Sequence, residues 1–176
     1  MLYTASKYNV LWSEVHSLRA AGITVLGMLG GAVQGFFGVL DGDDTSFNHS
    51  YSPLREMLAA TGLNGIDLDV EEPMSLSGIV RLIGRLKNDF GSNIIVTLAP
   101  VATALRKKKD KLSGLDYEKI SGTEISWYNT QFYCGWGSMA DTVDYDNIIQ
   151  HAWPPEKVIA AVLTNPKNCK GCSPLH

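Results

Sequence analysis

The sequence is poor in cysteine and has no long apolar run. Three cysteines occur among 176 residues, and Cys169 and Cys172 form a single C-x-x-C pair. A structural zinc site usually needs a second such pair, so this spacing favours a local disulfide or two ordinary thiols. No apolar run reaches the roughly 18 residues that span a bilayer. The first seven residues lack the basic start and apolar core of a signal peptide, so either the protein is intracellular or its natural start lies upstream.

Net charge is also low, which excludes two classes of partner. Fifteen Lys and Arg against eighteen Asp and Glu give a formal charge of -3, so we expect neither nucleic acid nor a membrane surface as a partner. The basic run over residues 106–111 (R-K-K-K-D-K) is typical of a solvated loop. Hydrophobic residues make up 45% and charged residues 19% of the chain, the composition of one soluble globular domain.

Short apolar runs alternate with helical patterns along the chain. Strands are predicted over residues 23–29, 64–71, 93–100, 125–133 and 157–164, and helices over residues 10–21, 53–62, 77–90, 115–120 and 145–151. We expect Gly22 to end the first helix and a loop over residues 32–52 to precede a helix that begins at Pro53. This α/β alternation fits a doubly wound sheet or part of an eight-unit barrel, which takes about 250 residues.

The predicted strand over residues 64–71 carries three acids on one face. Asp67, Asp69 and Glu71 alternate with apolar residues, and successive side chains of a strand point to opposite faces. Acids spaced roughly 6.6 Å apart along a strand interact, so at least one pKa should be raised. A carboxyl with a raised pKa suits general acid catalysis, and Glu71, nearest the C-terminal end of the strand, is the candidate donor.

Two other interpretations of these acids stay open at this point. The strand could lie at a solvated sheet edge, or the three acids could bind a divalent cation. Glu72 has the opposite parity, so we expect it on the surface or in contact with a loop.

The motif N-G-I-D-L-D-V-E at residues 64–71 resembles the signature D-G-x-D-x-D-x-E of glycoside hydrolase family 18, the chitinase and endo-β-N-acetylglucosaminidase family, and departs from it at Asn64. Three further segments resemble family motifs in the same order: V-L-G-M-L-G-G at 25–31, V-T-L-A-P at 96–100 and the fungal-type Y-N-T-Q-F-Y at 128–133. The resemblance implies a (β/α)8 TIM barrel, of which residues 1–176 would form a single partial catalytic domain with about strands 3–7 and their flanking helices, without the N- and C-terminal barrel strands.

The resemblance also implies an activity. It implies a retaining glycosidase that hydrolyses β-1,4 linkages at N-acetylglucosamine, in chitin or an N-glycan core, without a metal or other cofactor. The acetamido oxygen of the substrate would be the nucleophile. Glu71 would protonate the leaving oxygen, Asp69 would orient the acetamido group, and Asp67 would hold the proton or charge partner of Asp69.

Further site residues come from the same resemblance. Tyr133 would donate a hydrogen bond to the acetamido oxygen. The implied substrate-binding residues are Gln131, Gly30, Gly31, Ala99 and Trp136. Cys134 follows Tyr133 where the family often has Asn or Asp, and a thiol would be a weak hydrogen-bond partner there.

Other questions stay open. An inactive carbohydrate-binding relative, or a non-functional fragment of a longer enzyme, would carry the same motifs. The T-Q-F-Y strand with G-W-G at 135–137 resembles the fungal endo-β-N-acetylglucosaminidase branch, which cleaves N-glycans, more than it resembles the chitinases.

The family resemblance implies secretion, which would make the sequon at Asn48 relevant. The sequence gives no indication of the oligomeric state.

Overall fold

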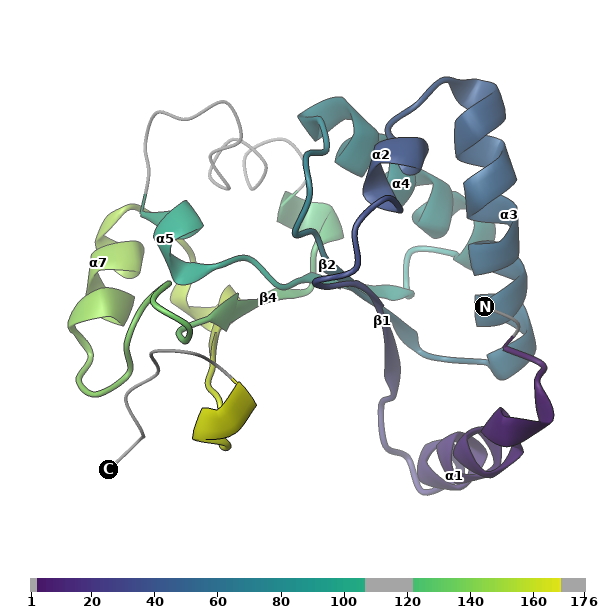
Figure 1. Cartoon of the computed structure of the whole chain (residues 1–176), viewed down its shortest axis with the longest axis horizontal. Helices are drawn as coiled ribbons and strands as arrows, with labels where there is room; N and C mark the ends of the chain where they lie inside the picture. Colours follow the sequence, from purple (N-terminus) through teal and green to yellow (C-terminus); the bar gives the residue numbers. More distant parts are fainter. Residues whose placement is uncertain (1–2, 107–121, 169–176) are drawn as a thin grey trace. The chain divides into compact units, whose positions relative to one another are not determined.

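The computed structural model describes residues 3–106 and 122–168, and these residues adopt an α/β fold (Figure 1). Its strands are β1 (Leu26–Gly30), β2 (Gly65–Asp69), β3 (Ile95–Leu98), β4 (Trp127–Gln131) and β5 (Val158–Ala161). They form a five-stranded parallel sheet in chain order, with β4 paired in parallel to both β3 and β5. Each strand lies within the range predicted for it or extends one residue beyond, so the predicted alternation is confirmed.

Helices connect the strands. They are α1 (Asn9–Ala20), α2 (Phe37–Leu40), α3 (Asp44–Thr61), α4 (Leu76–Phe90), α5 (Ala102–Leu105) and α7 (Val143–Gln150), with short 3-10 turns η1 (Ser6–Tyr8), η2 (Gly122–Glu124), η3 (Pro155–Lys157) and η4 (Pro166–Asn168). The predicted helix over residues 115–120, residues 107–111 of the basic run, Cys169 and Cys172 lie outside the described residues. In the part of the chain that the structure describes, no helix is long and apolar enough to cross a membrane.

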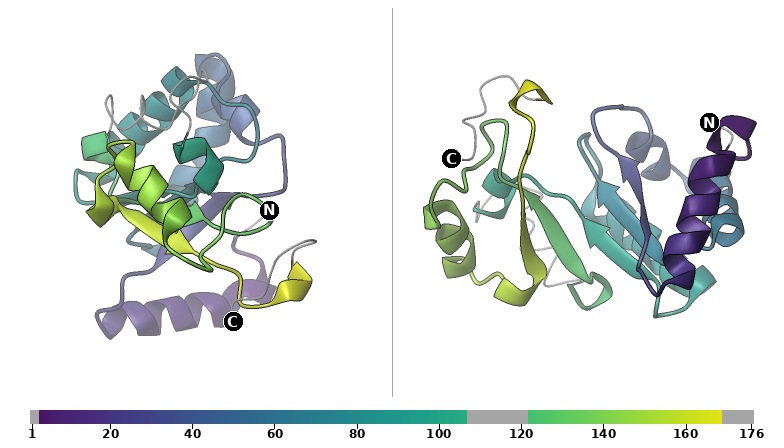
Figure 2. Two further views of the ribbon diagram at one scale, coloured as in Figure 1. Left: turned by 90° about the vertical axis from the view of Figure 1, so that its left-hand side faces the viewer. Right: turned by 90° about the horizontal axis from the view of Figure 1, so that it is seen from below.

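The chain divides into two compact units. The first comprises Met1–Asp67 and Glu71–Ile95, and the second comprises Leu68–Val70 and Val96–His176. The first unit holds α1 to α4 with β1 and most of β2, and the second holds α5, α7, β4 and β5. The right-hand view of Figure 2 shows β4 and β5 side by side.

Helix α3 corrects one prediction, since it begins at Asp44 and contains Pro53 in its interior. The predicted loop over residues 32–52 is therefore wrong over its second half, and wrong as well at the short helix α2. The Asp43 side chain accepts a hydrogen bond from the Ser46 N–H and caps the helix. A proline inside a helix costs about 3 kcal/mol. The buried side chains of Phe47, Tyr51, Leu54 and Leu58, which recur at helical spacing, offset that cost.

Helix ends follow the glycines, as the sequence predicts. Gly62 ends α3 in the left-handed conformation at φ 64°. Gly22, at φ 80°, follows the last turn of α1, where its N–H donates to the Arg19 carbonyl and the Ile23 N–H donates to the Leu18 carbonyl. This pair of bonds is the Schellman arrangement, in which a glycine after the helix satisfies the last carbonyls.

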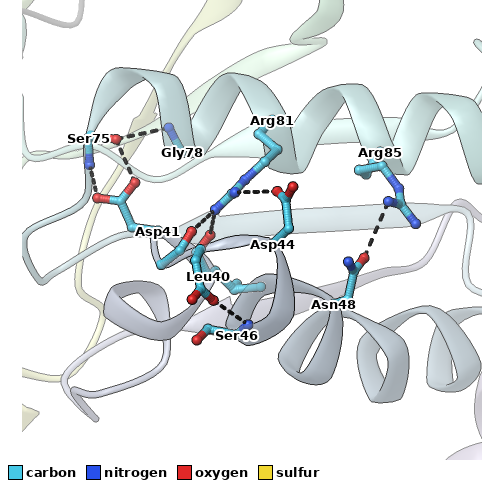
Figure 3. Close-up of polar contacts among 11 residues, drawn as sticks. Leu40, Asp41, Asp44, Ser46, Asn48, Ser75, Gly78, Arg81 and Arg85 are labelled. Atoms are coloured by element: carbon cyan, nitrogen blue, oxygen red, sulfur yellow. Dashed lines mark hydrogen bonds and ion pairs between the residues drawn. The ribbon is translucent and has the colours of Figure 1, made fainter.

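In the first unit, α2, α3 and α4 are joined by polar contacts (Figure 3). The Arg81 guanidinium, on α4, donates to the carbonyls of Leu40 and Gly42 at 2.7 and 2.6 Å. It also lies 4.3 Å from the centre of the Phe47 ring of α3. Helix α4 buries one face through Ile79, Leu82, Ile83 and Leu86, and Ser75 caps its N-terminus.

In the second unit, α5 and α7 lie side by side at the end of β4 (Figure 1). Arg106, directly after α5, forms an ion pair of 2.7 Å with Asp144 of α7. The buried Trp153 packs edge-on against Tyr128 of β4 and donates its indole N–H to the Leu105 carbonyl. These contacts fix the segments that follow β3 and β4.

Candidate active site

Strand β2 carries two buried acids. Asp67 and Asp69 are 6% and 8% exposed, and Ile66 and Leu68 on the opposite face are 1% exposed. Both faces of the strand are therefore covered, and the solvated-edge interpretation is wrong. Buried carboxylates need partners, and both aspartates have them.

Asn64, where the chain departs from the family motif, lies directly before β2 and bonds to two neighbouring segments. The Asn64 Oδ1 accepts the Val25 N–H at 2.9 Å, and its backbone N–H donates to the Val25 carbonyl at 2.9 Å. Its own carbonyl accepts the Ile95 N–H at 3.1 Å. Asn64 thus connects the chain segments that lead into β1 and β3. A Cβ at Gly65 would collide with the Ile95 carbonyl, so the glycine is required for this close approach.

Within the second unit, Gln131 joins Asp69 to Ala99, the residue that follows β3. The Gln131 Nε2 donates to the Asp69 Oδ1 at 3.1 Å and to the Ala99 carbonyl at 2.8 Å, and all three residues are buried. The two acceptors fix which end of the amide points at Asp69. Because both Nε2 hydrogens are used, a contact from Gln131 to a sugar would have to use Oε1.

Glu71 and Glu72 follow β2 and differ in their surroundings. Glu71 is exposed, two residues beyond the last strand residue. The Glu72 carboxylate accepts three successive backbone N–H groups, from Gly35 at 2.7 Å, Phe36 at 2.8 Å and Phe37 at 2.6 Å. The predicted loop contact of Glu72 is confirmed. These bonds, led by those from Gly35 and Phe37, hold the pKa of the Glu72 carboxyl below its ordinary value of 4.5.

The segment after β4 carries Tyr133 and Trp136. Tyr133 is half-buried, and Trp136 is 47% exposed. Cys134 is disulfide-bonded, so the expectation of a thiol at this position is wrong. The chain reverses there, with Cys134 at φ 54° and Gly135 at φ 82°.

The end of β1 carries the two glycines of the predicted site. Gly30 has φ 103° and Gly31 has φ 85°, a backbone that other residues rarely adopt. The chain can therefore leave β1 sharply and begin the loop that leads to Phe36.

Among the described residues, no group of three or more His, Cys, Asp or Glu side chains has an arrangement that could hold a metal ion. Asp67 and Asp69 also lie on a strand whose next acid, Glu71, is exposed. The divalent-cation interpretation therefore has no support in the described part of the chain.

The architecture and the sequence both match solved structures. Over 98% of this chain, the chitinase ChiC from Aspergillus fumigatus superimposes with a TM-score of 0.93 at 46% identity. A fungal endo-β-N-acetylglucosaminidase from glycosyl hydrolase family 18 superimposes over 98% of the chain with a TM-score of 0.90 at 44% identity. The chain belongs to glycoside hydrolase family 18. Its five-stranded sheet is part of the family 18 TIM barrel, as the motifs predicted.

The chain spans 62% of the length of each of these two family 18 structures. A family 18 chitinase from Pseudoalteromonas aurantia, at 22% identity and a TM-score of 0.77 over 93% of the chain, shares the fold. No family model and no curated protein matches the chain.

Sequence reasoning missed two features of the candidate site. It did not find that Gln131 donates to Asp69, although strand parity places Gln131 and Tyr133 on one face. It also did not find the three backbone partners of Glu72. For the second, the sequence offered a glycine at position 35, which takes φ 99° in the structure, a backbone that favours glycine.

Proposed function

We propose that this family 18 chain is a retaining glycosidase that hydrolyses β-1,4 linkages at N-acetylglucosamine by substrate-assisted catalysis. The observation that carries the proposal is the buried Asp69, held by Gln131, two residues before the exposed Glu71. This order provides a fixed carboxylate for the substrate's amide and an accessible carboxyl for the leaving group.

The reaction proceeds in two steps. Glu71 gives its proton to the glycosidic oxygen as the bond from that oxygen to the anomeric carbon breaks. The acetamido oxygen of the same sugar attacks the anomeric carbon, and Asp69 orients the acetamido N–H and stabilises the positive oxazolinium intermediate. Water then attacks the anomeric carbon as the bond from that carbon to the acetamido oxygen breaks, which restores the acetamido group, and the attacking water gives a proton to the Glu71 carboxylate. Two inversions at one carbon give retention.

Other residues support these groups. Asp67, two residues before Asp69 on the same face of β2, shares a proton or charge with it. Tyr133 donates to the acetamido oxygen. The substrate-binding residues are proposed to be Gln131, Gly30, Gly31, Ala99 and Trp136. The Ala99 carbonyl accepts a hydrogen bond from Gln131, so Ala99 contributes to substrate binding by holding the Gln131 amide in place.

The substrate is a glycan that contains N-acetylglucosamine, either chitin or an N-glycan core. The names of the two fungal relatives, a chitinase and an endo-β-N-acetylglucosaminidase, support this class. We further propose that residues 1–176 form one partial catalytic domain and that the protein is secreted, since the disulfide at Cys134 is typical of an oxidising compartment.

The test is hydrolysis by the purified chain of a fluorogenic N-acetylglucosamine oligomer and of a high-mannose glycopeptide. Glu71→Gln and Glu56→Gln are assayed beside it, the second as a control on the exposed surface of α3. Product release that is lost in Glu71→Gln and kept in Glu56→Gln supports the proposal. Faster hydrolysis of the oligomer indicates a chitinase, and faster hydrolysis of the glycopeptide indicates an endo-β-N-acetylglucosaminidase. Folded protein that releases nothing from either substrate, yet binds N-acetylglucosamine oligomers, would favour an inactive carbohydrate-binding relative.

A further inference from the structure

The loop between β1 and α2 is tied to the segment that follows Glu71. The Glu72 Oε2 accepts the Gly35 N–H, and its Oε1 accepts the N–H groups of Phe36 and Phe37. Three successive N–H groups directed at one carboxylate form an anion nest. The loop and Glu72 both belong to the first unit, so this nest is an internal feature of that unit.

The far end of α2 is held to the same segment. The Asp41 carboxylate accepts the Ser75 N–H at 2.8 Å, and Arg81 donates to the carbonyls of Leu40 and Gly42 (Figure 3). Helix α2 has only four residues and contributes little stability of its own. Residues 72–81 therefore clamp it at both ends, with Glu72 at its start.

Glu71 has no comparable support. It lies beyond β2, outside the strand pairing, and no described residue forms a hydrogen bond or ion pair with its side chain. The point and direction from which its side chain leaves the chain are therefore set by the backbone on either side. On one side that backbone continues from β2, and on the other it is fixed at once by the three bonds of Glu72.

We propose that Glu72 is a positioning residue for the general acid, because its bonds to the β1–α2 loop fix the backbone on which Glu71 projects. The inference rests on the proposed function, in which Glu71 protonates the leaving oxygen. A general acid displaced by about 1 Å loses much of its effect on the rate. The side chain of Glu72 itself touches neither the proton nor the substrate.

The experiment compares two leaving groups in wild type, Glu72→Gln and Glu72→Ala. One substrate is an umbelliferyl glycoside of an N-acetylglucosamine oligomer, whose acidic phenol departs with little protonation. The other is the unlabelled oligomer, whose sugar alcohol requires the acid. We expect kcat on the unlabelled oligomer to fall at least about tenfold in Glu72→Ala, out of the roughly 10²–10⁴ that acid–base catalysis contributes. On the umbelliferyl substrate we expect less than about a threefold loss.

The two variants should differ in degree. A glutamine keeps one oxygen for Phe36 and Phe37 but turns an N–H₂ toward the Gly35 N–H, so Glu72→Gln should show the smaller loss. Glu56→Gln is the matched control and should leave both rates unchanged. Equal losses on both substrates would overturn the positioning role and indicate only a structural one, and no loss on either would overturn the proposal outright.

A second measurement separates this proposal from the proposed function. Amide hydrogen exchange at Gly35, Phe36 and Phe37 reports the nest without any turnover, and Glu72→Ala should speed it at least about tenfold at these three positions. Unchanged exchange would overturn the inference even if the enzyme is active. If exchange speeds up but wild type hydrolyses neither substrate, the nest is real, the proposed function fails, and the positioning role fails with it.

Discussion

At the scale of single residues, the Gln131 amide is the donor that holds the buried Asp69 of the candidate site. It sits on β4 and satisfies an oxygen of Asp69 and the Ala99 carbonyl together. Buried polar groups that lose a partner are costly, and a charged one is costlier than a neutral one. The buried Asp69 carboxylate therefore depends for a hydrogen-bond donor on Gln131, which lies 62 positions later in the chain.

Gln131→Leu should lower the free energy of unfolding by about 1–3 kcal/mol, because it leaves a carboxylate oxygen and a carbonyl without their donor. Urea unfolding followed by circular dichroism measures the change. The control is Gln150→Leu, at the exposed end of α7, where we expect a change within about 0.5 kcal/mol. A stability of Gln131→Leu equal to that of the control would contradict the hydrogen-bond assignment.

Glu72 gives a prediction for the pH dependence of stability. Its pKa is lower in the folded protein than its ordinary value of 4.5, so its charged form stabilises the fold. That contribution is fully present above pH 4.5 and is lost as the pH falls through the lower folded value. The difference in unfolding free energy between wild type and Glu72→Gln should thus be constant from pH 7 to about 5 and shrink toward pH 3. A difference that stays constant down to pH 3 would refute the three-bond arrangement.

At the scale of elements, the start of β2 depends on one glycine. A methyl group at Gly65 would meet the Ile95 carbonyl, whereas Gly84, inside α4, has open space around its Cβ position. Gly65→Ala should therefore lower the free energy of unfolding by about 1–3 kcal/mol through overpacking. Gly84→Ala should raise it by about 1 kcal/mol through helix propensity.

Thermal and urea unfolding of the two alanine variants check this pair. Because the same substitution is made at both positions, the opposite signs separate local geometry from any general effect of alanine. Stabilisation by Gly65→Ala would mean that β2 and the segment before β3 do not approach as closely as described.

The elements also show what the sequence can predict. Alternating acids and apolar residues predicted β2, and helical spacing predicted α4 from residue 77 onward, because both patterns depend on local geometry. Helix α3 was predicted only from Pro53 onward, since Asp43, Ser46 and the proline resemble a loop. Burial of Phe47 and Tyr51 by tertiary contacts outweighed those local signals.

At the scale of the whole molecule, ordered motifs identified the family and the barrel, because four segments in a fixed order are specific. The partners of Asp69 and Glu72 were not predictable in the same way. Asp69 and Gln131 lie 62 positions apart in the chain, and Glu72 lies 35 to 37 positions from its three partners. Only the fold brings these residues together.

The most direct test of the central claim follows the anomers released from an unlabelled N-acetylglucosamine oligomer by proton NMR, with wild type and Glu71→Gln in parallel. Substrate-assisted catalysis predicts that the β-anomer appears first and converts slowly to the equilibrium mixture. It also predicts that Glu71→Gln forms product at least about a hundredfold more slowly. Initial release of the α-anomer, or an undiminished rate in Glu71→Gln, would contradict the account.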